Sequence, residues 1–242
     1  KWDCIKQRPQ YLAELLSRTN KVLYVNSGRS LLDYISSIFT FRKKESLYSS
    51  IKLVNPNLIV FTAPPFFLSY KMYDVGCLAQ LYNLFLSFIL KRVTRKIGWD
   101  RVDVLWLSHP NQVSLANLIF HKKLCYDIMD DYPYFRKNIF LRHQLDVMHR
   151  QLIDKADSIF ISSRELCNKH KDKRDIYVIE NAVDKTLFNS SLKHKIPNEL
   201  KNLSRPLVGI VGYIGHWMDL EIIYRSARIH PKWSFIIISP IY

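Results

Sequence analysis

The chain has 242 residues, of which 48% are hydrophobic and 24% are charged, and it carries a formal net charge of +15. This composition is that of a globular protein and excludes a disordered or fibrous chain. The basic charge favours an anionic partner, such as nucleic acid, an anionic membrane surface or a phosphorylated substrate, although a basic surface also serves solubility alone.

The first third of the chain predicts two short strands and two helices. Residues 5–18 have the apolar spacing of a helix, and residues 21–26 read as a buried strand. A second strand over residues 58–65 ends at two prolines. Residues 69–97 predict a helix with a basic end, and its apolar part is too short to cross a bilayer. This segment is either a core helix or an interfacial helix whose basic end meets anionic lipid.

The rest of the chain alternates strands and helices. Strands are predicted at residues 102–110, 158–163, 175–181, 207–211 and 234–239, and one more begins at Lys123 and runs into the acids Asp127, Asp130 and Asp131. Helices are predicted at residues 111–120, 141–156 and 164–170, and from Asp219 onward. A polar stretch at residues 189–205 reads as a linker. Strands with near-continuous apolar runs separated by helices predict a doubly wound, Rossmann-like α/β fold with parallel sheets.

Polar residues follow several of these strands. They are His109, Asp130, Asp131, Asn181 and Gly212. Because ligands of open parallel sheets bind at the carboxyl ends of the strands, we expect these residues to lie near a binding site. Two alternatives stay open: the acids serve only to cap a strand–loop junction, and His109 is a buried, hydrogen-bonded histidine.

The stretch from Leu207 to Asp219 is a strand, a turn with Gly212 and Gly215, and the start of a helix. Such a junction collects free backbone N–H groups and the positive end of a helix dipole, which together suit a phosphate. A tight turn without a ligand is the alternative interpretation.

Several common motifs are absent from the sequence. No Gly-x-Gly-x-x-Gly opens the chain, no Walker A motif is present, and no Gly-x-Ser-x-Gly elbow is found. The four cysteines lack C-x-x-C spacing, which argues against zinc and thioredoxin-like sites. The start lacks the apolar core of a signal peptide, which favours a cytoplasmic protein.

The order of six motifs resembles that of the GT-B glycosyltransferases of the group-1, family-4-like type, used in bacterial surface polysaccharide synthesis. The motifs are WDCIKQRPQYLAELL (2–16), YDIMDDYPYF (126–135), KADSIFISSREL (155–166), NAVDKTLF (181–188), LVGIVGYIGHWMDLEII (207–223) and PKWSFIIISP (231–240). Glu180, Ala182 and Ser239 depart from the family's Pro, Gly and Gly at these positions.

The resemblance implies an N-terminal, acceptor-side Rossmann-like domain over residues 1–188, a linker over 189–205, and the start of a nucleotide-sugar-binding domain over 206–242. The family's chain continues beyond this point and begins with an earlier strand, so we expect a chain truncated at both ends. A fragment of this kind should transfer sugar weakly or not at all.

The resemblance also implies an activity, which is transfer of a sugar from a nucleotide-sugar to a glycan or lipid-linked acceptor, with retention. No metal or cofactor is expected, and neither is nucleic-acid binding. The implied catalytic residues are Asp130, Asp131 and His109. The implied donor-binding residues are Gly212, Gly215, Asn181 and Asp219. Arg8 would contact the acceptor or a phosphate.

The implied location is the cytoplasm, on the inner face of the plasma membrane, with the anionic membrane surface as a partner. The alternative function is a degenerate, non-catalytic glycosyltransferase-like domain that binds a membrane or a partner protein through its basic surface.

Overall fold

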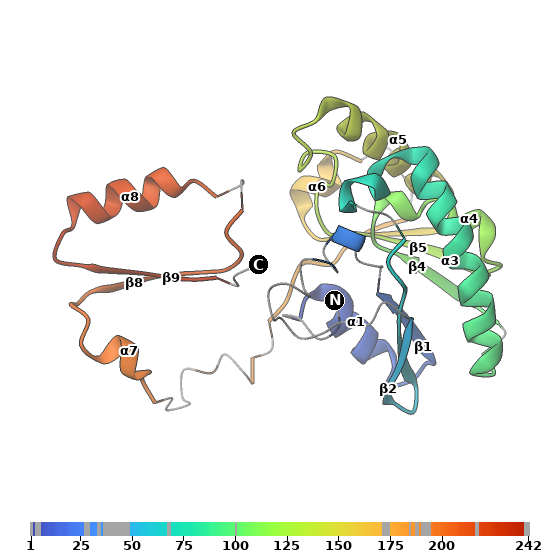
Figure 1. Ribbon diagram of the computed structural model, residues 1–242, viewed down its shortest axis with the longest axis horizontal. Coiled ribbons are helices and arrows are strands. Elements are labelled where there is room, and N and C mark those ends of the chain that lie inside the picture. The colour runs from blue at the N-terminus through green and yellow to red at the C-terminus, as the bar shows by residue number, and fades with distance from the viewer. Residues whose placement is uncertain are drawn as a thin grey trace. The chain divides into compact units, whose positions relative to one another are not determined.

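The computed structural model describes residues 2, 6–26, 30–32, 35, 49–66, 69–99, 101–170, 175–183, 185–186, 189, 195–215 and 218–239. The chain divides into two compact units, Lys1–Ala182 and Val183–Tyr242 (Figure 1). The strand-end residues His109, Asp130, Asp131 and Asn181 belong to the first unit, whereas Gly212, Gly215 and Asp219 belong to the second.

The first unit contains a mixed sheet of three strands, in the order β1-β3-β2. The strands β1 (Val22–Asn26) and β3 (Leu58–Thr62) were predicted and run parallel. The strand β2 (Ser50–Asn55) was not predicted and is antiparallel to β3. Only two residues separate β2 from β3, and so short a connection permits only an antiparallel pair. The side chain of Asn55 stabilises the turn by accepting a hydrogen bond from the backbone N–H of Asn57 at 2.9 Å.

The second sheet of this unit has four parallel strands in sequence order, β4-β5-β6-β7. Their bounds are Val104–Leu107, Lys123–Ile128, Ser158–Ile161 and Ile176–Val178. Parallel strands require crossover connections, which the intervening helices supply. The predicted α/β class with a parallel, Rossmann-like sheet is therefore confirmed, with β2 as an antiparallel addition.

Helices and helical turns account for most of the remaining described residues. They are α1 (Arg8–Leu16), η1 (Tyr70–Asp74), α3 (Gly76–Lys96), η2 (Pro110–Gln112), α4 (Leu115–Leu118), α5 (Ile139–Lys155) and α6 (Arg164–Asn168). The helix predicted over residues 111–120 is divided into η2 and α4. The side chain of Gln112 explains the interruption, because its Oε1 accepts hydrogen bonds from the backbone N–H groups of Ser108 and His109 and ties the turn to the end of β4.

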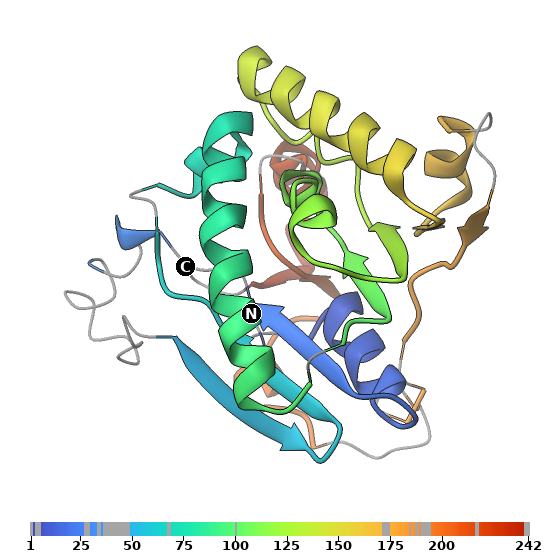
Figure 2. The same cartoon turned by 90° about the vertical axis from the view of Figure 1, so that its right-hand side faces the viewer.

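The core lies where the inner faces of α3 and α5 pack against the strands (Figure 2). Leu145 and Leu152 on α5 are fully buried, as are Tyr126 on β5 and Ile161 on β6. Each buried leucine of this kind stabilises the fold by about 1.5–3 kcal/mol relative to an exposed one. This core holds the four parallel strands in place, and thereby fixes the edge at which they end.

The second unit is a β-α-β arrangement preceded by a short helix. Its elements are α7 (Asn198–Lys201), β8 (Leu207–Val211), α8 (Leu220–Ile229) and β9 (Ser234–Ile238). The strands are parallel, with Leu207 opposite Ser234, and α8 forms the crossover. The helix α7 lies within the stretch of residues 189–205 that was predicted as a linker. The division into domains over residues 1–188 and 206–242 stays a prediction.

Gly212, directly after β8, has a φ of +150°, a conformation that residues with a side chain rarely adopt. A Cβ atom at this position would meet no atom within 4 Å, and the same is true at Gly209 inside β8. Gly212→Ala is therefore expected to destabilise the β8–β9 pair through backbone strain alone, by about 1–3 kcal/mol. Hydrogen exchange of the β8 and β9 amides should become roughly 5- to 150-fold faster, since about 1.4 kcal/mol is a factor of ten.

Gly209→Ala is the matched control, because it adds the same methyl group without a positive φ. We expect exchange at β8 and β9 to stay the same or to slow slightly in this variant. Equal acceleration in both variants would show that the methyl group itself, and not the backbone conformation at Gly212, causes the loss.

Candidate active site

The carboxyl ends of the four parallel strands form one edge of the first unit. His109 follows β4, Asp130 and Asp131 follow β5, and Asn181 follows β7. Because the strands are parallel and adjacent, the structure brings these predicted residues to the same edge. This is the edge at which open α/β sheets bind ligands.

Arg8 reaches this edge from the first turn of α1. Its Nε and Nη2 donate to the Asp127 carboxylate at 2.9–3.1 Å, and its Nη1 donates to the backbone carbonyl of Ile179 at 2.6 Å. The side chains of Arg8 and Asp127 are only 10% and 1% exposed. Arg8 therefore connects α1, β5 and the segment after β7, and these hydrogen bonds go to other groups of the chain. Contact of Arg8 with an acceptor or a phosphate stays a prediction.

His109 is held as a neutral ring. Its Nδ1 accepts a hydrogen bond from the backbone N–H of Asn111 at 3.3 Å, and the ring packs against Tyr132 with centroids 4.4 Å apart. Burial, and to a smaller extent the nearby charge of Arg136, lowers the pKa of His109 to about 4. With Nδ1 as an acceptor, the neutral ring carries its proton on Nε2. The geometry suits a hydrogen-bond donor better than a general base.

The neighbouring acids Asp130 and Asp131 differ in their surroundings. Asp131 pairs with Lys169 at 2.6 Å, and this pair raises the pKa of Lys169. In the part of the chain that the structure describes, no cation pairs with the carboxylate of Asp130, which is exposed at the strand end. Partial desolvation raises the pKa of Asp130. Asp130 is therefore better suited than Asp131 to accept a proton.

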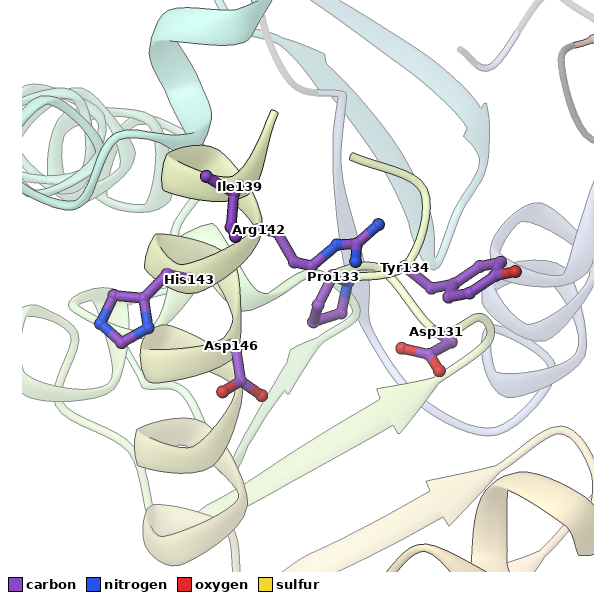
Figure 3. Close-up of a pocket in the computed structure, with 7 residues that line it drawn as sticks. All are labelled: Asp131, Pro133, Tyr134, Ile139, Arg142, His143 and Asp146. Atoms are coloured by element: carbon purple, nitrogen blue, oxygen red, sulfur yellow. The ribbon is translucent and has the colours of Figure 1, made fainter. Parts of the chain in front are cut away.

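A hollow of about 350 Å³ opens beside this edge, between the loop after β5 and the first turns of α5. Figure 3 shows its lining, in which Arg142 extends from α5 toward Tyr134 while the ring of His143 points away from them. The lining residues are Asp131, Pro133, Tyr134, Ile139, Arg142, His143 and Asp146. Two carboxylates and a guanidinium beside an exposed tyrosine are groups that hydrogen-bond and stack with sugars.

Two contacts that support the edge were missed by sequence reasoning. Asp74, fully buried at the end of η1, accepts from the Nε of Arg136 at 2.7 Å and so ties η1 to the loop after β5. Burial raises the pKa of Asp74, and Arg136 opposes this effect. The hydroxyl of Tyr126 lies 2.7 Å from Nδ1 of His149, inside the core. In the sequence, Asp74 stands alone before an apolar helix and His149 lies among the apolar residues of another helix. These two positions were the patterns from which the contacts could have been predicted.

His149 makes the stability of the first unit depend on pH. It is 7% exposed, and burial, followed by the charge of His170, lowers its pKa to about 4, against about 6.5 in an unfolded chain. Between about pH 4 and about pH 6.5 the unfolded chain binds more protons than the folded protein does. The contribution of His149 to the free energy of unfolding is therefore complete above about pH 6.5 and is lost as the pH falls toward about 4. The loss is at most about 3 kcal/mol. Urea denaturation at a series of pH values measures this loss.

His149→Gln is expected to reduce the pH dependence, because it removes one of the groups that take up a proton on unfolding; His109, whose pKa is also lowered to about 4, keeps its contribution. His143→Gln, on the exposed side of the same helix, is the matched control and should leave the slope unchanged. Equal slopes in the original protein and in His149→Gln would contradict the assignment.

In the second unit, several polar groups around the loop after β8 form hydrogen bonds within the chain. The backbone N–H of Gly212 donates to the carbonyl of Ile238 at 3.0 Å, and the carbonyl of Gly215 accepts from Met218 at 3.0 Å. The carboxylate of Asp219 caps α8 by accepting from the N–H groups of Glu221 and Ile222 at 3.0 and 3.4 Å. A phosphate at this helix terminus would have to displace that carboxylate, so a donor-phosphate role for this loop stays a prediction.

Among the residues that the structure describes, no group of three His, Cys, Asp or Glu side chains has the arrangement of a metal site. At the edge of the first unit lie hydrogen-bond donors, a neutral histidine and the carboxylate of Asp130, which forms no ion pair with a described residue. Such a set can orient hydroxyl groups and accept a proton.

No protein-family model matches the chain. It is 26% identical over 183 residues to a protein of Bacillus subtilis (strain 168) named as the teichuronic acid biosynthesis glycosyltransferase TuaH, and the match covers 70% of this chain and 46% of that protein. A solved structure of trehalose-6-phosphate synthase aligns with 91% of this chain and 64% of its own, with a TM-score of 0.46 and 11% identity. The chain thus spans about half the length of the curated relative.

The similarity in sequence confirms the resemblance to glycosyltransferases that the motifs predicted.

Proposed function

We propose that this chain is part of a glycosyltransferase that transfers a sugar from a nucleotide-sugar to a glycan or lipid-linked acceptor of the cell surface. The observation that carries the proposal is the similarity to TuaH over 70% of the chain. The set of polar residues at the strand ends of the first unit supports it, because the set has a candidate base and a candidate hydrogen-bond donor at one edge.

In this proposal Asp130 accepts the proton of the attacking acceptor hydroxyl, and Nε2–H of His109 donates a hydrogen bond to a sugar hydroxyl. Arg8 and Asp74 act as positioning residues, since they hold β5 and its following loop. The second unit contributes to the donor site through the loop at Gly212 and Gly215. Transfer proceeds with retention, so the acceptor oxygen bonds to the anomeric carbon on the face from which the bond to the diphosphate breaks. No metal ion takes part, and protein dipoles and cations neutralise the leaving diphosphate.

Calorimetry with UDP-sugars and GDP-sugars tests the proposal on the whole protein that contains this chain. We expect one nucleotide-sugar to bind and the parent nucleotide to compete with it. A folded whole protein that binds none of them would overturn the proposal. The anomeric configuration of the product, read by NMR, decides whether the sugar is transferred with retention.

The alternative is a non-catalytic domain that retains the fold and binds a membrane or a partner protein. The basic net charge of +15 favours it. Substituting both Asp130 and Asp131 by Asn separates the two functions, because a binding module would keep its partner whereas an enzyme would lose transfer without unfolding.

A further inference from the structure

The helix α3 has apolar side chains on both of its faces. The face toward the core holds Ala79, Tyr82, Leu86, Leu90 and Val93, all of them buried. On the opposite face Leu81, Leu84 and Phe88 are 49%, 55% and 55% exposed. Their spacing of three and then four residues places them in one stripe. An ordinary amphipathic helix has polar residues on this side, so the exposed stripe requires an explanation.

The stripe continues into a cluster of positive charges. Lys91, Arg92 and Arg95 follow at the spacing that keeps them on the same side of α3, and all three are exposed. The guanidinium of Arg92 lies over the ring of Phe88 at 4.1 Å, which joins the apolar and basic parts. These six residues, Leu81, Leu84, Phe88, Lys91, Arg92 and Arg95, are called the outer face of α3.

No acidic residue balances these charges within α3, whose sequence contains neither Asp nor Glu. In the described ranges no carboxylate forms an ion pair with Lys91, Arg92 or Arg95. Basic side chains that have no ion-pair partner among the described residues and lie beside exposed apolar ones complement a surface that is both anionic and apolar.

A hollow of about 480 Å³ extends the apolar part of the outer face. Phe66, Phe85 and Leu118 line it together with Leu81, Leu84 and Phe88, so that the apolar area reaches beyond the single helix. In Figure 2 α3 lies in front of the strands of the first unit, on the viewer's side. None of the helices in the described ranges combines the length and the hydrophobicity that a membrane crossing requires.

We propose that the outer face of α3 docks the protein on the surface of a bilayer that contains anionic lipids. The three apolar side chains enter the region between head groups and acyl chains, and the three basic side chains contact lipid phosphates. Nucleic acid would match the charges but not the three exposed apolar side chains. The inference goes beyond the proposed transferase activity and does not depend on it, because lipid binding is measured without a sugar donor.

Sedimentation of the full chain with vesicles tests the proposal. We expect binding to vesicles of phosphatidylcholine with about one third phosphatidylglycerol, and at least tenfold weaker binding to phosphatidylcholine alone, with a decrease at raised salt. Equal binding to both kinds of vesicle, or to neither, would overturn the proposal.

Two variants address the two parts of the face. Leu84→Gln with Phe88→Gln, and separately Lys91→Gln with Arg92→Gln and Arg95→Gln, should each weaken binding at least tenfold. The matched controls are Ile51→Gln with Leu53→Gln on exposed β2 positions, and Lys201→Gln with Arg228→Gln and Lys232→Gln in the second unit. Equal losses in variant and control would show diffuse binding and overturn the proposal.

A second measurement needs no substitution in the outer face. Cys77 is exposed at the start of α3, one turn before Leu81 on the same side. An environment-sensitive fluorophore on Cys77, in a Cys4→Ser background, should shift its emission to the blue on anionic vesicles. No shift, or DNA binding that depends on the basic residues and displaces the vesicles, would overturn the proposal.

Discussion

Replacing Arg8 by Met is expected to lower the free energy of unfolding by about 3–5 kcal/mol. The guanidinium donates to Asp127 through Nε and Nη2 at 2.9–3.1 Å, and to the carbonyl of Ile179 at 2.6 Å. The side chain of Asp127 is 1% exposed. Without Arg8, a charged carboxylate is left in the interior without its partner, and this desolvation is the main cause of the loss. Denaturation by urea at neutral pH, followed by circular dichroism, measures it.

The Lys6–Glu14 pair provides the matched control for this substitution. Its side chains are 39% and 34% exposed, so Lys6→Met should cost less than about 1 kcal/mol. The double variant Arg8→Met with Asp127→Leu removes both charges and should recover part of the loss. A cost for Arg8→Met no greater than that for Lys6→Met would mean that the buried pair does not stabilise the edge of the sheet.

Asp130→Asn is expected to lower the rate of sugar transfer by about 10²–10⁴-fold in the whole protein. Asp130 has no cationic partner among the described residues, and its pKa is raised by partial desolvation, so its carboxylate is available to accept a proton. Asn keeps the size of the side chain but accepts no proton. The loss should appear in kcat, while the dissociation constant of the donor stays unchanged.

The neighbouring Asp131→Asn is the control for this prediction. Asp131 already pairs with Lys169 at 2.6 Å, and its substitution should lower transfer less than about tenfold. A raised pKa also moves the acidic limb of the pH–rate profile upward, since a protonated base is inactive; the limb should disappear in Asp130→Asn. A larger loss in Asp131→Asn than in Asp130→Asn would reverse the assignment of the base.

The predicted elements that matched best were those with a strong local pattern. The apolar run at residues 207–211 became β8, and the strand predicted to begin at Lys123 became β5, which ends at Ile128. The helix over residues 141–156 begins at Ile139 and ends at Lys155. The strand β2 was missed because its side chains are mostly exposed, which leaves little hydrophobic pattern. It is defined by its hairpin with β3 and not by burial.

The candidate site was predicted only in part. The strand-end positions of His109, Asp130 and Asn181 followed from the order of strands and loops, since parallel strands end at one edge. The hydrogen-bond and ion-pair partners at this edge could not be predicted from that order. Arg8 and Asp127 are 119 residues apart in the chain, and no local pattern relates them. The carboxylates of Asp130 and Asp131 look alike in the sequence, and only the position of Lys169 distinguishes them.

What the sequence by itself determined is which residues share an element and which end of a strand they follow, because both depend on neighbours within a few positions along the chain. The alternation of apolar strands with helices, the strand-end set and the basic end of the helix over residues 69–97 are of this kind. Only the tertiary structure decided which apolar residues of α3 meet the core, which acid has a cation and where Arg8 points. Those outcomes depend on contacts between distant segments, and burial in such contacts also sets the pKa values of His109 and His149.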